Sequence, residues 1–175
     1  ELALRHPERV RALVLCCTSE GGACGASHPL HELPELPLRE RVERQHVLGD
    51  GFLDERWRKA HPERFAALVE QALAQAAVGA SDPGHGDGLA RPLEARRGHD
   101  TASRLRCIGA PVLLCAGRRD RIAPPANTEA MARELPGAAV RWFDGGHLFL
   151  VQDPRAWPAI VAWLGAALPA RTDEG

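Results

Sequence analysis

The sequence predicts an α/β protein built on a parallel β-sheet. Three short apolar segments, residues 10–19, 110–117 and 138–146, are bounded by polar residues, glycine or proline, which is typical of strands. Helical patterns lie between the second and third segments and after the third. Because neighbouring parallel strands need a crossover connection, which is usually a helix, this alternation of strands and helices favours a parallel sheet.

The N-terminal region, residues 1–26, is predicted to contain the end of a helix and the first strand. The segment ELALRHPERV has the pattern of a helix tail that ends at its His-Pro pair, because the residue before a proline disfavours helical geometry. The strand at residues 10–19 is expected to be buried on both faces, as strands of parallel sheets are. Cys16 and Cys17 are expected to pack inside it as small apolar side chains.

A long insert, residues 27–103, separates the first two strands and is predicted to form a helical cap, because it is too long for a plain loop. Its clearest helix covers residues 62–79, and shorter helices are expected at Leu38–Leu48 and Leu89–Arg97. Residues 81–88 are expected to form a loop. The apolar stripe of the longest helix consists of Phe65, Leu68, Val69, Ala72, Leu73 and Ala76. This stripe is expected to pack against other helices, with the lining of an acyl pocket as the alternative.

The C-terminal region, residues 104–175, is predicted to hold the other two strands, a helix between them at residues 127–135 and a helix after them. Asp153 is expected to cap the last helix, and Pro154 suits its first position. The apolar face of this helix is predicted to consist of Trp157, Ile160, Val161 and Leu164. All four tryptophans are expected to be packed, namely Trp57, Trp142, Trp157 and Trp163.

The composition argues against several kinds of partner. A net charge of −1 lacks the basic surplus of nucleic-acid-binding proteins, and no apolar run approaches the ~20 residues that span a membrane. The five cysteines include no C-x-x-C pair, so a disulfide framework and a structural zinc site are both unsupported, and a cytoplasmic location is expected. Met131 is the only methionine, and we therefore expect that Glu1 is not the natural start and that the chain is part of a longer protein.

A carboxylate and a histidine follow two neighbouring strands, each just after the strand ends. Asp120 lies after the second strand in a turn closed by two prolines, and His147 lies after the third strand and two glycines. Since the carboxyl ends of parallel strands meet at one edge of a sheet, we expect these side chains to come within hydrogen-bond reach, about 2.6–3.2 Å. The carboxylate would then fix the imidazole tautomer and leave the other ring nitrogen free to act as a base.

Other polar residues are expected to have structural roles. Asp144 and Asp153 compete with Asp120 as the partner of His147, but turn contacts and a helix cap are expected for them. Ser19 lacks the glycine pattern of a nucleophile turn. A further group of acids and histidines matches no metal-ligand spacing, so a solvated surface is expected instead of a metal site. This group consists of His85, Asp87, His99 and Asp100.

Three segments resemble proteins of the α/β-hydrolase fold, namely LALRHPERVRALVLCCTSEGG, APVLLCAGRRDRIAPPANTEAMARELPGA and FDGGHLFLVQDP. The resemblance implies the C-terminal part of that family's parallel sheet, about three strands with flanking helices, plus the inserted helical cap. Asp120 matches the family's acid in its G-x-x-D-x-x-x-P turn, and His147 matches its base in G-G-H-L. Ile122 and Leu148, which lie near them in the sequence, are expected to contact the substrate.

The family's nucleophile lies in a G-x-S-x-G motif, and no such pentapeptide occurs in this sequence. We expect the motif to precede Glu1. The resemblance then implies a parent hydrolase of the serine type that cleaves an ester, lactone or related acyl bond of a small molecule without a metal or organic cofactor. The 175-residue chain alone is expected to be inactive. A cofactor-free haloperoxidase-like enzyme and a non-catalytic binding or accessory protein on the same fold are the alternatives.

Overall fold

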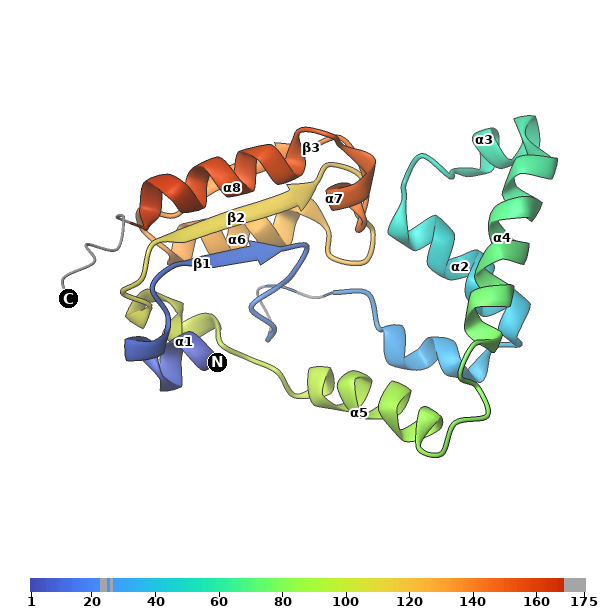
Figure 1. Ribbon diagram of the computed structural model, residues 1–175, viewed down its shortest axis with the longest axis horizontal. Coiled ribbons are helices and arrows are strands. Elements are labelled where there is room, and N and C mark those ends of the chain that lie inside the picture. Colours follow the sequence, from blue (N-terminus) through green and yellow to red (C-terminus); the bar gives the residue numbers. More distant parts are fainter. Residues whose placement is uncertain (23–24, 26, 169–175) are drawn as a thin grey trace, which may run out of the picture.

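The core of the protein is a three-stranded parallel β-sheet with the strand order β1-β2-β3 (Figure 1). The computed structural model describes residues 1–22, 25 and 27–168. The strands are β1 (Leu13–Cys16), β2 (Val112–Gly117) and β3 (Ala139–Phe143). In the register of the sheet, Leu114 lies between Leu15 of β1 and Val140 of β3. The predicted α/β class with a parallel sheet is therefore confirmed.

The central strand is more deeply buried than its first neighbour. Every residue of β2 is buried, whereas every residue of β1 is only half-buried. Within the described residues, β1 pairs with β2 alone, so one of its edges has no neighbouring strand. The prediction that residues 10–19 form a strand buried on both faces is therefore wrong, because a strand at an edge is covered less completely than a central one.

Helices cover both faces of the sheet. Alternate residues of a strand point to opposite faces, so Leu113 and Cys115 pack in one cluster while Val112 and Leu114 pack in the other. Residues of α7 and α8 complete the first cluster, and residues of α6 and η3 complete the second, with α8 and α6 on opposite sides of β2 (Figure 1). The bounds are η3 (Ala102–Cys107), α6 (Pro125–Glu134), α7 (Phe149–Gln152) and α8 (Ala156–Ala167).

The last helix buries a different face from the predicted one. In α8, Ile160 is buried and Leu164 packs on the same cluster, as expected. Trp157 and Val161 are instead 55% and 62% exposed, so their assignment to the buried face is wrong, as is the packing predicted for Trp157. Because the segment AWPAIVAWLGAA is apolar almost all round, its pattern does not determine which face meets the sheet.

Asp153 does not cap this helix. The residue that precedes α8 is Arg155, and no side chain caps that end. Asp153 is buried, and its Oδ2 accepts a 2.8 Å bond from the backbone N–H of Asp144 and a 2.7 Å bond from the Arg155 guanidinium. The hydrogen bond from the Arg155 guanidinium, more than any other contact, holds the pKa of the Asp153 carboxyl well below its usual range. Asp153 therefore ties the end of β3 to the start of α8, and Asp144 makes turn contacts as predicted.

The insert between β1 and β2 is helical, and its helices lie beyond the carboxyl ends of the strands or beside the sheet (Figure 1). Its elements are η2 (Leu30–Glu35), α2 (Leu38–Gly49), α3 (Glu55–Ala60), α4 (Pro62–Ala77) and α5 (His85–Arg97). Helices α2 and α4 pack together, and each buries one residue, Val42 and Val69. The loop predicted at residues 81–88 is wrong in its second half, because α5 begins at His85 after Gly84, whose φ of 84° suits glycine. None of the described helices combines the length and the apolar composition needed to cross a bilayer.

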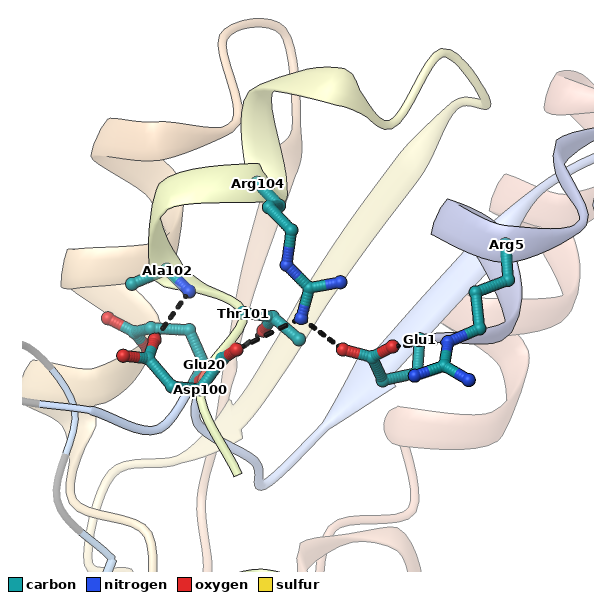
Figure 2. Close-up of polar contacts among 7 residues, drawn as sticks. All are labelled: Glu1, Arg5, Glu20, Asp100, Thr101, Ala102 and Arg104. Atoms are coloured by element: carbon teal, nitrogen blue, oxygen red, sulfur yellow. Dashed lines mark hydrogen bonds and ion pairs between the residues drawn. The ribbon is translucent and has the colours of Figure 1, made fainter. Parts of the chain in front are cut away.

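Polar contacts join the N-terminal helix α1 (Leu2–Arg5), which is followed by η1 (Pro7–Arg9), to the segment that returns from the insert. Figure 2 shows Glu1 between two arginines, with Arg5 Nε 2.8 Å from its carboxylate and Arg104 on the other side. These contacts, first of all the one with Arg104, lower the pKa of Glu1 to about 2. The backbone N–H of Thr101 donates a 2.8 Å bond to the carbonyl oxygen of Glu20, which secures the chain after β1.

Candidate active site

Asp120 is held rigidly in the turn that follows β2. Its Oδ1 accepts bonds of 2.7 and 2.9 Å from the backbone N–H groups of Ile122 and Ala123. The side chain is fully enclosed, with 0% of its surface exposed. A carboxylate buried in this way needs partners for both oxygens, because an unpaired buried charge is strongly unfavourable. The turn satisfies Oδ1 and leaves Oδ2 available for a side chain outside the turn.

His147 is that partner. Its Nδ1 lies 2.9 Å from Asp120 Oδ2, so the predicted contact between the two side chains is confirmed. The imidazole is 33% exposed, although the carboxylate beneath it is fully buried. The backbone N–H of His147 donates a 2.6 Å bond to the carbonyl oxygen of Gly49, which fixes the main chain as well as the ring. Neither Asp144 nor Asp153 takes this place, since both contact Arg155 instead.

Two glycines allow the backbones around the pair to approach closely. A Cβ on Gly117 would lie 2.1 Å from the carbonyl oxygen of Gly146, and a Cβ on Gly146 would lie 1.8 Å from that of Gly49. Both distances are far below van der Waals contact, so only glycine fits at either position. The end of β2, the loop after β3 and the end of α2 therefore meet at one point beside His147.

The end of α2 is bonded to both loops that carry the pair. Leu48 accepts a 3.0 Å bond from the N–H of Arg121, and Gly49 accepts the bond from His147. Gly51 donates a 3.0 Å bond to the carbonyl oxygen of Arg119. Because these are main-chain bonds, they position the insert against the sheet edge without depending on particular side chains.

A cavity of about 510 Å³ opens beside the imidazole. Its wall is formed by the segment after β1, the start of η2, the end of α5 and the residues next to Asp120. His147 and Ile122 both line it, which agrees with a position of Ile122 near a substrate. Leu148 is 61% exposed and is absent from the described wall, so the structure does not bring it to the cavity. The volume is in the range typical of small-molecule sites.

Cys17 lies beside the pair, just after the end of β1 and not inside that strand as predicted, although it packs on the apolar cluster of the sheet as expected. It follows the last residue of β1 and has a φ of 47°, a conformation that is rare for residues other than glycine. Its Sγ lies 3.9 Å from the carbonyl oxygen of Gly146, and burial raises the pKa of the thiol. In the described part of the chain, Cys17, Asp120 and His147 are the one group of three potential metal ligands, with atoms within 4.8 Å of one another. Since three N–H donors already occupy the Asp120 oxygens and the thiol resists ionisation, this arrangement suits proton transfer better than metal binding.

The comparisons with known proteins place this sheet in a known fold. No protein-family model matches the sequence. The structure is similar to that of a thermophilic esterase, with a TM-score of 0.66 and 18% identity over 95% of this chain and 60% of that one. It is also similar to an enol-lactonase from Burkholderia xenovorans LB400, with a TM-score of 0.65 and 20% identity over 93% of this chain and 59% of that one. The fold is that of the α/β hydrolases.

The chain spans only part of the α/β hydrolases that it resembles. A poly(3-hydroxyalkanoate) depolymerase from Ectopseudomonas oleovorans is 27% identical over 168 residues, which are 92% of this chain and 54% of that protein. The two solved relatives are likewise covered to about 60% of their length. The likeness therefore concerns the part of an α/β hydrolase that contains the three strands and the insert.

The other polar residues that were assigned structural roles from the sequence lie near the site or on the surface. Ser19 Oγ is 3.1 Å from Ser27 Oγ, and both residues line the cavity. Asp87 pairs with Arg91 on the exposed face of α5, and Asp100 Oδ1 accepts a bond from the N–H of Ala102. Four further basic residues line the cavity and carry no motif that marks them in the sequence, namely His28, His31, Arg96 and Arg97.

Proposed function

We propose that this chain carries the histidine and the acid of a serine-type α/β hydrolase that cleaves an ester, lactone or related acyl bond. The observation that supports this most strongly is the 2.9 Å contact between His147 Nδ1 and the buried Asp120, made at the wall of a cavity large enough for a small acyl substrate. The names of the similar proteins, an esterase, an enol-lactonase and a polyester depolymerase, agree with this class of bond.

The proposed roles follow from the hydrogen bonds. An ionised carboxylate only accepts, so Asp120 keeps the proton of the imidazole on Nδ1 and leaves a lone pair on Nε2. Nε2 takes the proton of the attacking hydroxyl and returns it to the leaving group, and Asp120 stabilises the imidazolium formed between these steps. Water then releases the acyl group from the nucleophile by the same route in reverse.

In this proposal the nucleophile lies outside the present sequence, in a G-x-S-x-G turn of the longer protein. Ser19 and Ser27 line the cavity but bond to each other, and neither sits in such a motif. The 175-residue chain alone therefore lacks the group on which His147 acts and is expected to be inactive. The proposal requires no metal or organic cofactor.

The test compares the longer gene product with this chain. The longer protein is expected to hydrolyse p-nitrophenyl butanoate, whereas the 175-residue chain should be no faster than a protein blank. The variant His147→Ala should lower kcat by about 10⁴-fold or more, since members of such a group act as a unit. His85→Ala, at the start of α5 and outside the described wall of the cavity, is the matched control and should leave kcat unchanged. Turnover that survives His147→Ala would place the active site elsewhere.

A further inference from the structure

We propose that Arg96 and Arg97, at the end of α5, select acyl substrates that carry a free carboxylate at the end remote from the scissile bond. The inference rests on the proposed function, because it assigns the substrate class of the same cavity. Leu93, Arg96 and Arg97 all line that cavity and follow the spacing i, i+3 and i+4, so one face of α5 forms part of its wall. Arg91, on the same helix, is absent from the wall.

The described wall of the cavity is basic. Besides the two guanidinium groups it contains His28, His31 and His99, and no aspartate or glutamate. A hollow lined by charge of one sign concentrates ligands of the opposite sign, because its low-dielectric walls focus the field. An anionic group on the substrate is therefore favoured there, even though the whole chain has a net charge of −1.

Arg96 has no competing partner in the part of the chain that the structure describes. Among the described residues, its side chain forms no hydrogen bond or ion pair. Its charge nevertheless acts on the wall, since burial first, and then the charges of Arg44 and Arg96, lower the pKa of His28. A guanidinium that faces a cavity without a carboxylate partner is available to bind one from a ligand, and its planar fork fits a carboxylate in two parallel bonds.

Arg97 can also turn to a ligand. It contacts Glu94 at 3.4 Å, but the two side chains are 59% and 68% exposed. Ion pairs at such exposed positions contribute little, so a ligand carboxylate can replace Glu94 at small cost.

Four further acids lie near the wall. Glu32 lies 4.0 Å from His31 and is mostly exposed, and Asp120 is paired with His147. The carboxylates of Glu20 and Asp100 lie behind the wall glycines Gly25 and Gly22.

Helix electrostatics offers a different reason for two arginines at this position. Cations in the last turn of a helix interact favourably with its carbonyl end, and Arg96 and Arg97 occupy the last turn of α5. In that case their removal would lower the stability of α5 and leave ligand binding unchanged. A comparison of charged and neutral ligands separates the two explanations, because only the cavity role distinguishes between the ligands.

The test uses isothermal titration calorimetry with two matched probes, monomethyl adipate, which has one carboxylate, and neutral dimethyl adipate. The wild-type chain should bind the monomethyl ester at least about tenfold more tightly, and the double variant Arg96→Gln/Arg97→Gln should lose that difference. Arg91→Gln removes one charge from the same helix outside the wall and should retain it. The preference should also fall as salt is added.

Two further measurements keep the outcome unambiguous. Arg96→Lys/Arg97→Lys retains both charges and should keep a reduced preference for the monomethyl ester. Unchanged binding of dimethyl adipate by the glutamine variant shows that this variant remains folded. His147→Ala should abolish hydrolysis in the longer protein while binding of the monomethyl ester persists, so failure of the proposed reaction and failure of this inference are distinguishable. Equal binding of the two probes by the wild-type chain, including no binding of either, would overturn the inference, as would an undiminished preference in the glutamine variant.

Discussion

The two sides of the cavity differ in how deeply their residues are buried and how firmly hydrogen bonds hold them. On the side of the sheet, every residue of β2 is buried, Asp120 is enclosed, and main-chain bonds fix the loops around it. On the opposite side, no described side chain of α5 is buried, and the helix ends in exposed arginines. Proton transfer needs fixed distances, whereas a charged ligand can be bound by side chains that move to meet it. The difference suggests that the sheet edge determines the reaction and that α5 influences which substrates enter.

The largest expected effect lies on the sheet side. Asp120→Asn leaves the size of the side chain unchanged but removes its charge and favours the wrong imidazole tautomer. We expect kcat of the longer protein to fall by about 10⁴-fold while the Michaelis constant for a neutral ester changes little. The measurement is steady-state hydrolysis of p-nitrophenyl butanoate by both proteins. A variant that keeps more than about a tenth of the activity would remove Asp120 from the mechanism.

A second comparison concerns stability. Leu114 of β2 has 0% of its surface exposed, and Leu114→Ala should lower the free energy of unfolding by about 2–5 kcal/mol. Leu93 of α5 is only half-buried, so Leu93→Ala should cost less than about 1 kcal/mol. Urea denaturation of the two variants measures the contrast directly. Similar losses at the two positions would mean that α5 is held as firmly as the sheet.

A substitution of Gly146 tests the contact between α2 and the loop that carries His147. Gly146→Ala places a Cβ against the carbonyl oxygen of Gly49, and the forced shift should lower the free energy of unfolding by about 1–3 kcal/mol. Gly165→Ala, in α8, meets no atom within 4 Å and should instead be neutral or stabilising by up to about 1 kcal/mol. Thermal melting of both variants measures whether each substitution lowers or raises stability. A stable Gly146→Ala protein would show that α2 moves freely relative to the pair.

The smallest expected effect is the pH dependence of the Glu1 contacts. The pKa of Glu1 is lowered from 4.5 to about 2, so its contribution is present above the unfolded value and disappears as the pH falls to about 2. We expect Glu1→Gln to have a slightly lower melting temperature than the wild type at neutral pH and the same melting temperature near pH 2. Melting temperatures of both proteins between pH 7 and about pH 2 check this. A gap between the two melting temperatures that widens towards low pH would contradict a stabilising role of the ionised Glu1 carboxylate.

The sequence predicted side-chain contacts best where they follow from the ends of neighbouring strands. The contact of Asp120 with His147 could be predicted because each follows a strand and neighbouring parallel strands end at one edge of the sheet. Arg96 and Arg97 could not be found in this way, since exposed arginines at a helix end look the same whether they face solvent or a cavity. The role of Asp153 was missed for a related reason, because local capping rules do not include its distant partner Asp144.

Among the described residues, one edge of β1 has no partner strand, which makes concentration a variable in measurements on the isolated chain. The N–H and C=O groups along that edge can pair with a second copy of the chain. Antiparallel pairing of two such edges about a two-fold axis closes after two copies, whereas a head-to-tail contact leaves a free edge at each step and continues to grow. Sedimentation over a concentration series would distinguish these cases, and a single species of constant mass would exclude both. If either form assembles, the free energy of unfolding of this chain depends on its concentration.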